Sequence, residues 1–152
     1  VQLWYLGDQK HAWMPTASAN LFHTACRTGW DQTSGGFYYT LDHDNLPDQR
    51  VRIWWPACEG GAAAAILQNA FKDNTAQRWY EDIWTVISRD FIDPKGGWWP
   101  VPQDSTEIDD HPFQGKPDLY HSVQACLIPL LAPSSGLLKG LFASELNIYE
   151  SE

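Results

Sequence analysis

The chain has 152 residues, of which 43% are hydrophobic and 19% are charged, a composition typical of a globular domain with a buried core. The formal net charge is −9 and the ten Lys and Arg residues are scattered, which argues against a nucleic-acid partner because phosphate binding needs clustered basic residues. No apolar run approaches the roughly 20 residues that cross a bilayer, so we expect no membrane partner.

The cysteines give no sign of a disulfide framework or a zinc site. Cys26, Cys58 and Cys126 are odd in number and lack CxxC spacing, so we expect three buried free thiols and a reducing, cytoplasmic location. The first residues show no basic segment followed by an apolar one, the pattern of a secretory leader. We expect no metal and no other cofactor.

Tryptophan is unusually frequent, with nine residues in the chain. A flat indole can stack on the C–H face of a sugar ring, and it can equally fill space between helices. We expect two or three of the tryptophans to face a ligand and the others to pack in the core.

The first half of the chain predicts two helices separated by an extended insert. Pro15 suits a first helical turn, and apolar residues follow at helical spacing to a C-terminal cap at Gly29. Residues 37–41 are aromatic and β-branched between turn residues, which predicts a short strand-like segment. A second helix is predicted from Pro56 to about Lys72.

A third helix is predicted after an N-cap at Asp73 or Asn74. Its apolar residues recur every fourth position, at Trp79, Ile83, Ile87 and Phe91. The helix should stop near Asp93, because the residue before a proline disfavours the helical conformation.

The last part of the chain predicts a second insert and two more helices. Gly96 and Gly97 open an extended piece over 98–101, followed by a polar loop. A helix is predicted from about Asp118 to about Leu131, with a kink or early end at Pro129. A short helix over 137–146 follows.

The two inserts begin alike, with GGFYYTLD and GGWWPVPQD, and each lies between helices. This similarity favours a repeated helical-hairpin unit, as in a toroid. The alternative is that Gly-Gly before aromatic residues is simply good turn chemistry.

Four segments occur in a characteristic order: GGFYYTLDHDNLP, RIWWPACEGGAAAAIL, WTVISRDFIDPKGGWWPVPQD and GKPDLYHSVQACLIPL. Together they resemble the C-terminal part of the N-acylglucosamine 2-epimerase superfamily, and GKPDLYH is most similar to its mannose and sulfoquinovose isomerase branch. The resemblance implies an all-α fold, helical hairpins forming part of an (α/α)6 barrel with short β-hairpin-like inserts. Residues 1–152 would be one domain, comprising about two hairpins and part of a third.

The resemblance also implies site residues. His121 of DLYH corresponds to one of two family histidines that face each other across the sugar without a metal. A lone histidine is more often a surface or capping residue, but its DLYH context favours a catalytic one. The implied substrate-binding residues are Trp54, Trp55, Glu59, Trp98, Lys116 and Asp118. For Glu59 a helix-dipole role, and for Asp118 an N-cap role, are open alternatives.

The function implied is aldose–ketose isomerisation of the mannose type through an enediol, with histidine as the acid and base. None of the other histidines is followed by Glu in the family's Gly-His-x-x-Glu pattern, so the second histidine is expected to be absent. A non-catalytic sugar-binding or structural remnant is the alternative, and a helical interaction module a less favoured one. Exposed helix faces in an incomplete barrel predict a homo-oligomer.

Overall fold

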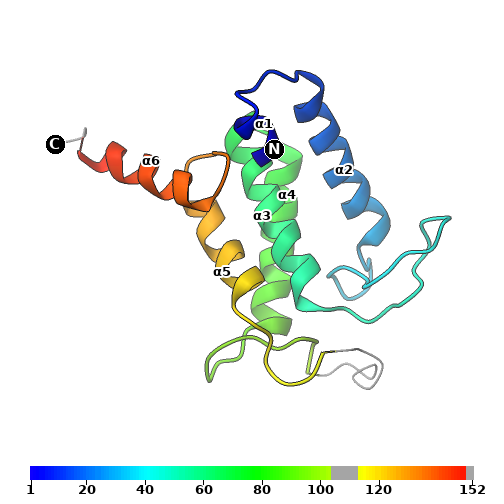
Figure 1. The fold of residues 1–152 in the computed structure, drawn as a ribbon. Helices are drawn as coiled ribbons and strands as arrows, with labels where there is room; N and C mark the ends of the chain where they lie inside the picture. Colours follow the sequence, from blue (N-terminus) through cyan, green and yellow to red (C-terminus); the bar gives the residue numbers. More distant parts are fainter. Residues whose placement is uncertain (104–112, 150–152) are drawn as a thin grey trace.

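The computed structural model describes residues 1–103 and 113–149, and these residues form helices joined by loops (Figure 1). The elements are α1 (Gln2–Leu6), α2 (Trp13–Gly29), α3 (Trp54–Phe71), α4 (Asn74–Val86), the π-helix η1 (Ile87–Phe91), α5 (Tyr120–Leu127), the 3₁₀ helix η3 (Ile128–Leu130) and α6 (Leu137–Tyr149). Within these ranges the inserts contain isolated antiparallel bridges in place of extended strands. The predicted all-α class with hairpin-like inserts is confirmed.

Helix α3 lies at the centre of the arrangement, with α2 on one side and α5 on the other (Figure 1), and α4 packs along it. It is rich in alanine and glycine, and its buried residues cover more than half of the circumference of the helix. A helix that is apolar all round is buried by its neighbours, and the small side chains allow those neighbours to approach. For example, a Cβ at Gly60 would lie 2.8 Å from the Phe37 ring.

Local signals predicted the helix ends unevenly. Asp73 is the N-cap of α4 as expected, whereas α2 is capped at Trp30 and not at Gly29, and α3 begins at Trp54, two residues before Pro56. Asp73 caps α4 by accepting hydrogen bonds at Oδ1 from the backbone N–H groups of Thr75 (2.9 Å) and Ala76 (3.0 Å). Its other oxygen lies 2.7 Å from His23 Nε2 on α2. Partial burial opposes ionisation, but these donors prevail and lower the pKa of Asp73. The same side chain therefore starts α4 and ties it to α2.

Two more helical regions differ from the predictions, and a third confirms one. Helix α1 was not predicted, because its five residues include no capping side chain or proline signal. The end of the third predicted helix is the π-helix η1, which brings Ile87 and Phe91 fully into the core. Helix α5 ends at Leu127 and passes into η3 around Pro129, the early end that proline predicted.

One cysteine is not buried. Cys26 and Cys58 are buried, and burial raises the pKa of each thiol to about 12, whereas Cys126 is exposed. Cys126 follows Val123 by three residues on α5, and Val123 is also exposed, so both lie on the outer face of the helix. The expectation of three buried thiols was wrong for this residue.

The two Gly-Gly inserts fold alike. In the first, the Asp31 N–H donates to the Gly36 carbonyl (2.8 Å), the Gly35 N–H to the Asp31 carbonyl (2.9 Å) and the Tyr38 N–H to the Gly29 carbonyl (2.9 Å). Gly35 and Gly36 have φ values of 74° and 89°, which glycine adopts at little cost. We call this segment, residues 31–36, the first glycine turn.

The second insert repeats that pattern. The Asp93 N–H donates to the Gly97 carbonyl (3.0 Å), the Gly96 N–H to the Asp93 carbonyl (2.8 Å) and the Trp99 N–H to the Phe91 carbonyl (2.6 Å). Gly96 and Gly97 also have positive φ values, 107° and 79°. We call residues 93–97 the second glycine turn. The shared hydrogen bonds support the repeated hairpin unit over a coincidence of turn chemistry.

Candidate functional site

The site lies where α3 and α5 begin, at the same end of the molecule (Figure 1). Glu59 is on the second turn of α3, and His121 is the second residue of α5. The His121 Nδ1 atom lies 2.8 Å from Glu59 Oε1. The two side chains are 25% and 51% exposed, respectively, so the pair is accessible from solvent while the imidazole is largely enclosed.

This hydrogen bond fixes the tautomer of the imidazole. An ionised carboxylate only accepts hydrogen bonds, so Nδ1 must carry the proton that it donates to Glu59. In the neutral ring the Nε2 atom then has a free lone pair, which can accept a proton. Carboxylates orient histidines in this way in many catalytic sites.

Aromatic rings enclose the imidazole. The Trp55 ring centroid lies 5.8 Å from that of His121 with an interplanar angle of 32°, and the Trp54 centroid lies 6.2 Å away at 77°. Trp54 is buried and meets Phe113 edge to face at 4.9 Å. Trp55 is half-buried and meets Tyr39 at 6.4 Å. Trp55 is therefore the indole beside His121 that a ligand can reach.

A hollow of about 500 Å³ opens beside Trp55 and Glu59, between α2, α3 and the first insert. Trp55 and Glu59 line it together with mainly apolar side chains, including Phe22 and Leu21 from α2 and Phe37 from the insert. Glu59 therefore faces the hollow and also holds His121. A hollow of this size, apolar with a few polar groups, can accommodate a small molecule.

The other predicted site residues lie elsewhere. The Lys116 ammonium binds the Asp93 carboxylate and the Gly96 carbonyl, and it lies 4.8 Å from the Trp99 ring centroid. The pKa of Asp93 is held below its usual range by Lys116 and by the Lys95 backbone N–H. Trp98 packs at 6.5 Å from Trp84, in a partly buried position.

Asp118 is exposed, and its Oδ1 atom accepts the backbone N–H of Tyr120 at 2.9 Å. It therefore satisfies a backbone donor at the first turn of α5, but the N-cap of this helix is Leu119, so the N-cap alternative was wrong by one residue. The carboxylate lies three residues before His121 and helps to fix how the helix begins.

The sequence prediction missed two aromatic residues of the site. The ring centroids of Tyr39 and Phe113 lie 6.2 Å apart, and these rings complete the aromatic cluster by packing against Trp55 and Trp54, respectively. Tyr39 lies in the extended insert, whose aromatic composition was the available signal. Phe113 stands alone in a polar loop, and only the folded arrangement shows its role.

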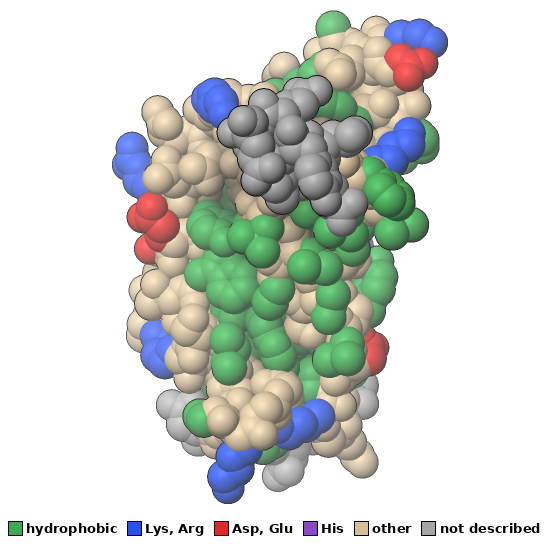
Figure 2. Space-filling view, turned by 90° about the vertical axis from the view of Figure 1, so that its left-hand side faces the viewer, with side chains coloured by type: hydrophobic (Ala, Val, Ile, Leu, Met, Phe, Trp, Pro, Cys, Tyr) green, Lys and Arg blue, Asp and Glu red, His purple; other side chains and the backbone are tan. Residues whose placement is uncertain are grey.

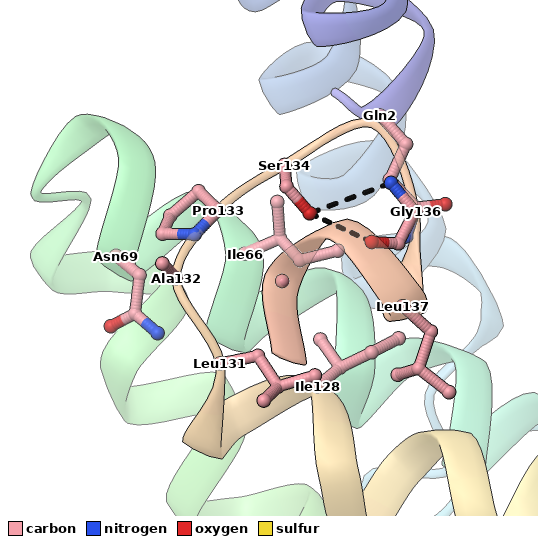
Figure 3. Close-up of a pocket in the computed structure, with 11 residues that line it drawn as sticks. Gln2, Ile66, Asn69, Ile128, Leu131, Ala132, Pro133, Ser134, Gly136 and Leu137 are labelled. Carbon is pink, nitrogen blue, oxygen red and sulfur yellow. Dashed lines mark hydrogen bonds between the residues drawn. The ribbon is translucent and has the colours of Figure 1, made fainter. Parts of the chain in front are cut away.

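A second, small cavity lies far from His121, beneath the turn that joins η3 to α6 (Figure 3). Its walls include Ile66 and Asn69 in the C-terminal half of α3, and Ser134 hydrogen-bonds across the turn to Gly136. Its volume of about 20 Å³ suffices for about one water molecule. It is too small for a sugar.

Two further features are absent from residues 1–103 and 113–149. No group of three His, Cys, Asp or Glu side chains there is placed to hold a metal ion. No helix in this part of the chain has the length and apolarity required to cross a membrane. His111 falls between these ranges, outside the described residues.

The chain is similar in sequence to proteins named D-mannose isomerase. D-mannose isomerase from Pseudomonas cannabina pv. alisalensis is 40% identical over 132 residues, which is 84% of this chain and 32% of that protein. D-mannose isomerase from Thermobifida fusca is 34% identical over 137 residues, 88% of this chain and 33% of that protein. This chain thus spans about a third of the length of these relatives.

A solved structure is also similar. The crystal structure of a D-mannose isomerase superposes with a TM-score of 0.73 at 26% identity, covering 85% of this chain and 34% of that one. The family model for N-acylglucosamine 2-epimerase (GlcNAc 2-epimerase) matches residues 1–125. That match occupies the N-terminal part of this chain and does not support the expected C-terminal position within the family. With most of its length matched by the family model and its fold shared with a solved relative, the chain belongs to the N-acylglucosamine 2-epimerase family.

Proposed function

We propose that this chain carries part of the acid–base site of an aldose–ketose isomerase that acts on mannose or a similar aldose. The observation that carries the proposal is the hydrogen bond of 2.8 Å between Glu59 and His121, beside the Trp55 indole and an open hollow. The names of the relatives support the substrate class. Nothing in the reaction proposed below requires a metal or an organic cofactor.

The proposed chemistry moves one proton from C2 to C1 and transfers another from the C2 hydroxyl to O1. His121 Nε2 accepts the proton from C2 of the open-chain aldose, and the electrons of the C–H bond form the C1–C2 double bond. The π electrons of the C1 carbonyl move to O1, which takes up a proton and gives an enediol. A proton delivered to C1, with loss of the C2 hydroxyl proton, then gives the ketose. Histidine suits both steps because its ordinary pKa lies near neutrality.

Glu59 has two proposed roles, because it lines the hollow and also contacts the imidazole. Its Oε1 atom holds His121 in the Nδ1-protonated tautomer, and its other oxygen is available to a sugar hydroxyl. Trp55 would stack on the sugar, while buried Trp54 supports it from behind. Asp118 would hold the first turn of α5 through its hydrogen bond to the Tyr120 N–H. Trp98, which packs against Trp84, would lie at the edge of the sugar site.

The proposal includes a second proton-transfer group outside the described residues. The relatives are about three times as long as the chain, and His23, the histidine of α2, is engaged with Asp73. We therefore propose that residues 1–152 form one domain-sized part of a larger barrel. A chain that binds sugar without converting it is the alternative, favoured by the single histidine beside Glu59.

Proton exchange tests the two candidates directly. When the chain is incubated with mannose in D₂O, we expect deuterium to enter C2 faster than in buffer, because this step needs only the base. Ketose should appear more slowly, since losing one general catalyst typically costs about 10²–10⁴-fold. NMR of the sugar measures both rates in one sample.

Tryptophan fluorescence in the same titration separates the candidates. A saturable change with mannose but no deuterium exchange would support the sugar-binding alternative and contradict the acid–base role. The absence of both a fluorescence change and deuterium exchange would contradict both candidates. Glucitol, which has no carbonyl group, serves as the control ligand that cannot exchange.

We also propose that the chain self-associates through the face formed by α5 and α6. Figure 2 shows hydrophobic side chains gathered down this side of the molecule. Leu130 and Leu138 are 75% and 70% exposed there, and burying such a surface is favourable. Sedimentation should give a dimer or larger species, and Leu130→Lys with Leu138→Lys should give a monomer.

The matched control is Leu46→Lys, because Leu46 is 59% exposed on the first insert, away from this face. This variant should sediment like the unmodified chain. A compact monomer in the unmodified chain at micromolar concentration would contradict the proposal.

A further inference from the structure

Each glycine turn is contacted by a basic residue that precedes a helix of the site and donates a hydrogen bond to a carbonyl of the turn. We call each of these contacts a clasp. Arg52 lies two residues before α3, and its Nη1 atom donates to the Gly35 carbonyl at 2.9 Å. Lys116 lies four residues before α5, and its ammonium donates to the Gly96 carbonyl. Gly35 and Gly96 are equivalent, because each is the first glycine of its turn.

Each clasp also contains a buried carboxylate. Arg52 Nη1 lies 2.8 Å from Asp90 Oδ2, and the Asp90 side chain is 8% exposed. Lys116 pairs with Asp93, whose side chain is 6% exposed. The two carboxylates occupy different positions: Asp93 begins the glycine turn that Lys116 contacts, whereas Asp90 lies in η1, which follows α3 in the chain.

The helices that follow the clasps carry the two partners of the proposed site. Helix α3 presents Trp55 and Glu59, and α5 presents His121. The segment before α5 has few other anchors among the described residues: the Phe113 ring packs on Trp54, and Asp118 accepts the Tyr120 N–H at the start of the helix. The Lys116 clasp is thus the ionic link between this segment and the second glycine turn.

We propose that Lys116 is a positioning residue, which holds the start of α5 so that His121 meets Glu59, and that it does not bind substrate. This inference rests on the proposed role of His121. The Lys116 ammonium already contacts the Asp93 carboxylate and the Gly96 carbonyl, and it makes a cation–π contact with the Trp99 ring. Arg52 is its counterpart for α3, because it also donates to the carbonyl of the first glycine of a turn.

The test compares Lys116→Met with Lys116→Arg and with Lys95→Met, a matched lysine of the same turn. The readout is the ¹⁵N spectrum of the His121 imidazole, which reports the tautomer without any need for turnover. We expect a single Nδ1-protonated form in the unmodified chain and in Lys95→Met. Lys116→Met should give a mixture of tautomers, and Lys116→Arg should restore most of the single form.

Wherever the chain converts mannose, Lys116→Met should lower kcat about tenfold or more and leave KM nearly unchanged, because misplacing a catalytic group affects the chemical step. A raised KM with an unchanged His121 spectrum would instead show substrate binding and overturn the inference. Changes confined to the Trp98 and Trp99 indole signals would also overturn it, since the clasp would then shape only the turn.

If Lys116→Met does not fold, Asp93→Asn supplies the same readout, because it removes the charge and keeps the side-chain shape. A mixed tautomer in Asp93→Asn supports the clasp, and an unchanged tautomer overturns it. Failure of the proposed function looks different: the unmodified chain would show the Nδ1-protonated His121 and no deuterium exchange into mannose.

Discussion

Replacing His121 by alanine is expected to lower the rate of deuterium entry at C2 of mannose by about 10²–10⁴-fold, the range found for removal of a general acid–base group. The physical reason is that the free Nε2 lone pair, which the hydrogen bond to Glu59 leaves available, would be lost. The same variant should remain folded, because the imidazole is partly exposed at the end of a helix. NMR of the sugar and thermal unfolding measure the two effects.

The matched control is His43→Ala, since His43 is exposed in the first insert. Its exchange rate should equal that of the unmodified chain. Glu59→Gln is the informative intermediate: the amide keeps the size of the side chain but lacks the charge that favours a donor at Nδ1. We expect a smaller loss, about tenfold. An unchanged rate in His121→Ala would place the base elsewhere and remove the main support for the proposed function.

Replacing Asp90 by asparagine is expected to lower the free energy of unfolding by about 3 kcal/mol, because breaking a largely buried ion pair leaves an unpaired charge inside the protein. Asp90 accepts from Arg52 at 2.8 Å and from Arg89 at 2.5 and 2.7 Å. The same two arginines donate to the carbonyl groups of Gly35 and Ser34. One carboxylate therefore joins η1 to the first glycine turn and to the segment before α3.

The pH dependence of this stabilisation follows from the pKa of Asp90. Burial alone would raise that pKa, but Arg89 and Arg52 outweigh burial and lower it. A carboxyl group with a lower pKa in the folded chain stabilises it above the unfolded value of about 4, and this contribution is lost as the pH falls through the folded value. The difference in stability between the unmodified chain and Asp90→Asn should therefore shrink in acid.

Urea unfolding followed by tryptophan fluorescence between neutral pH and the acid range measures this difference. Asp82→Asn is the control, because Asp82 is exposed on α4 and surface substitutions usually change stability little. A difference between Asp90→Asn and the unmodified chain that stays constant down to the lowest pH would contradict the ionic origin of the stabilisation.

The His121 and Asp90 variants both test how the starts of α3 and α5 are arranged. His121 supplies the proposed chemistry, whereas the clasps at Arg52 and Lys116 supply the positions of α3 and α5. Because the Arg52 clasp depends on Asp90, the Asp90→Asn variant should also loosen the first glycine turn, which leads directly to Phe37 in the wall of the hollow. The stability of this fold and the geometry of the site are therefore coupled through the two glycine turns.

The sequence alone determined the features that depend on neighbouring residues. Pro15 indicated the first turn of α2, Asp73 the start of α4, and Pro129 the early end of α5, because capping and proline effects act within one helical turn. The paired Gly-Gly inserts also indicated the repeated hairpin, since positive φ angles are a local property of glycine. The motif order indicated the family, and with it His121 and Glu59 as candidates.

Only the tertiary structure decided which of these residues meet. Glu59 and His121 are 62 positions apart, and no local signal states that their helices begin at the same end. Lys116 resembled a substrate-binding residue in the sequence, yet it binds a turn 20 residues earlier. The exposure of Cys126 likewise depended on which face of α5 packs on α3. Long-range contacts of this kind follow from how helices pack, and they cannot be read from any one segment.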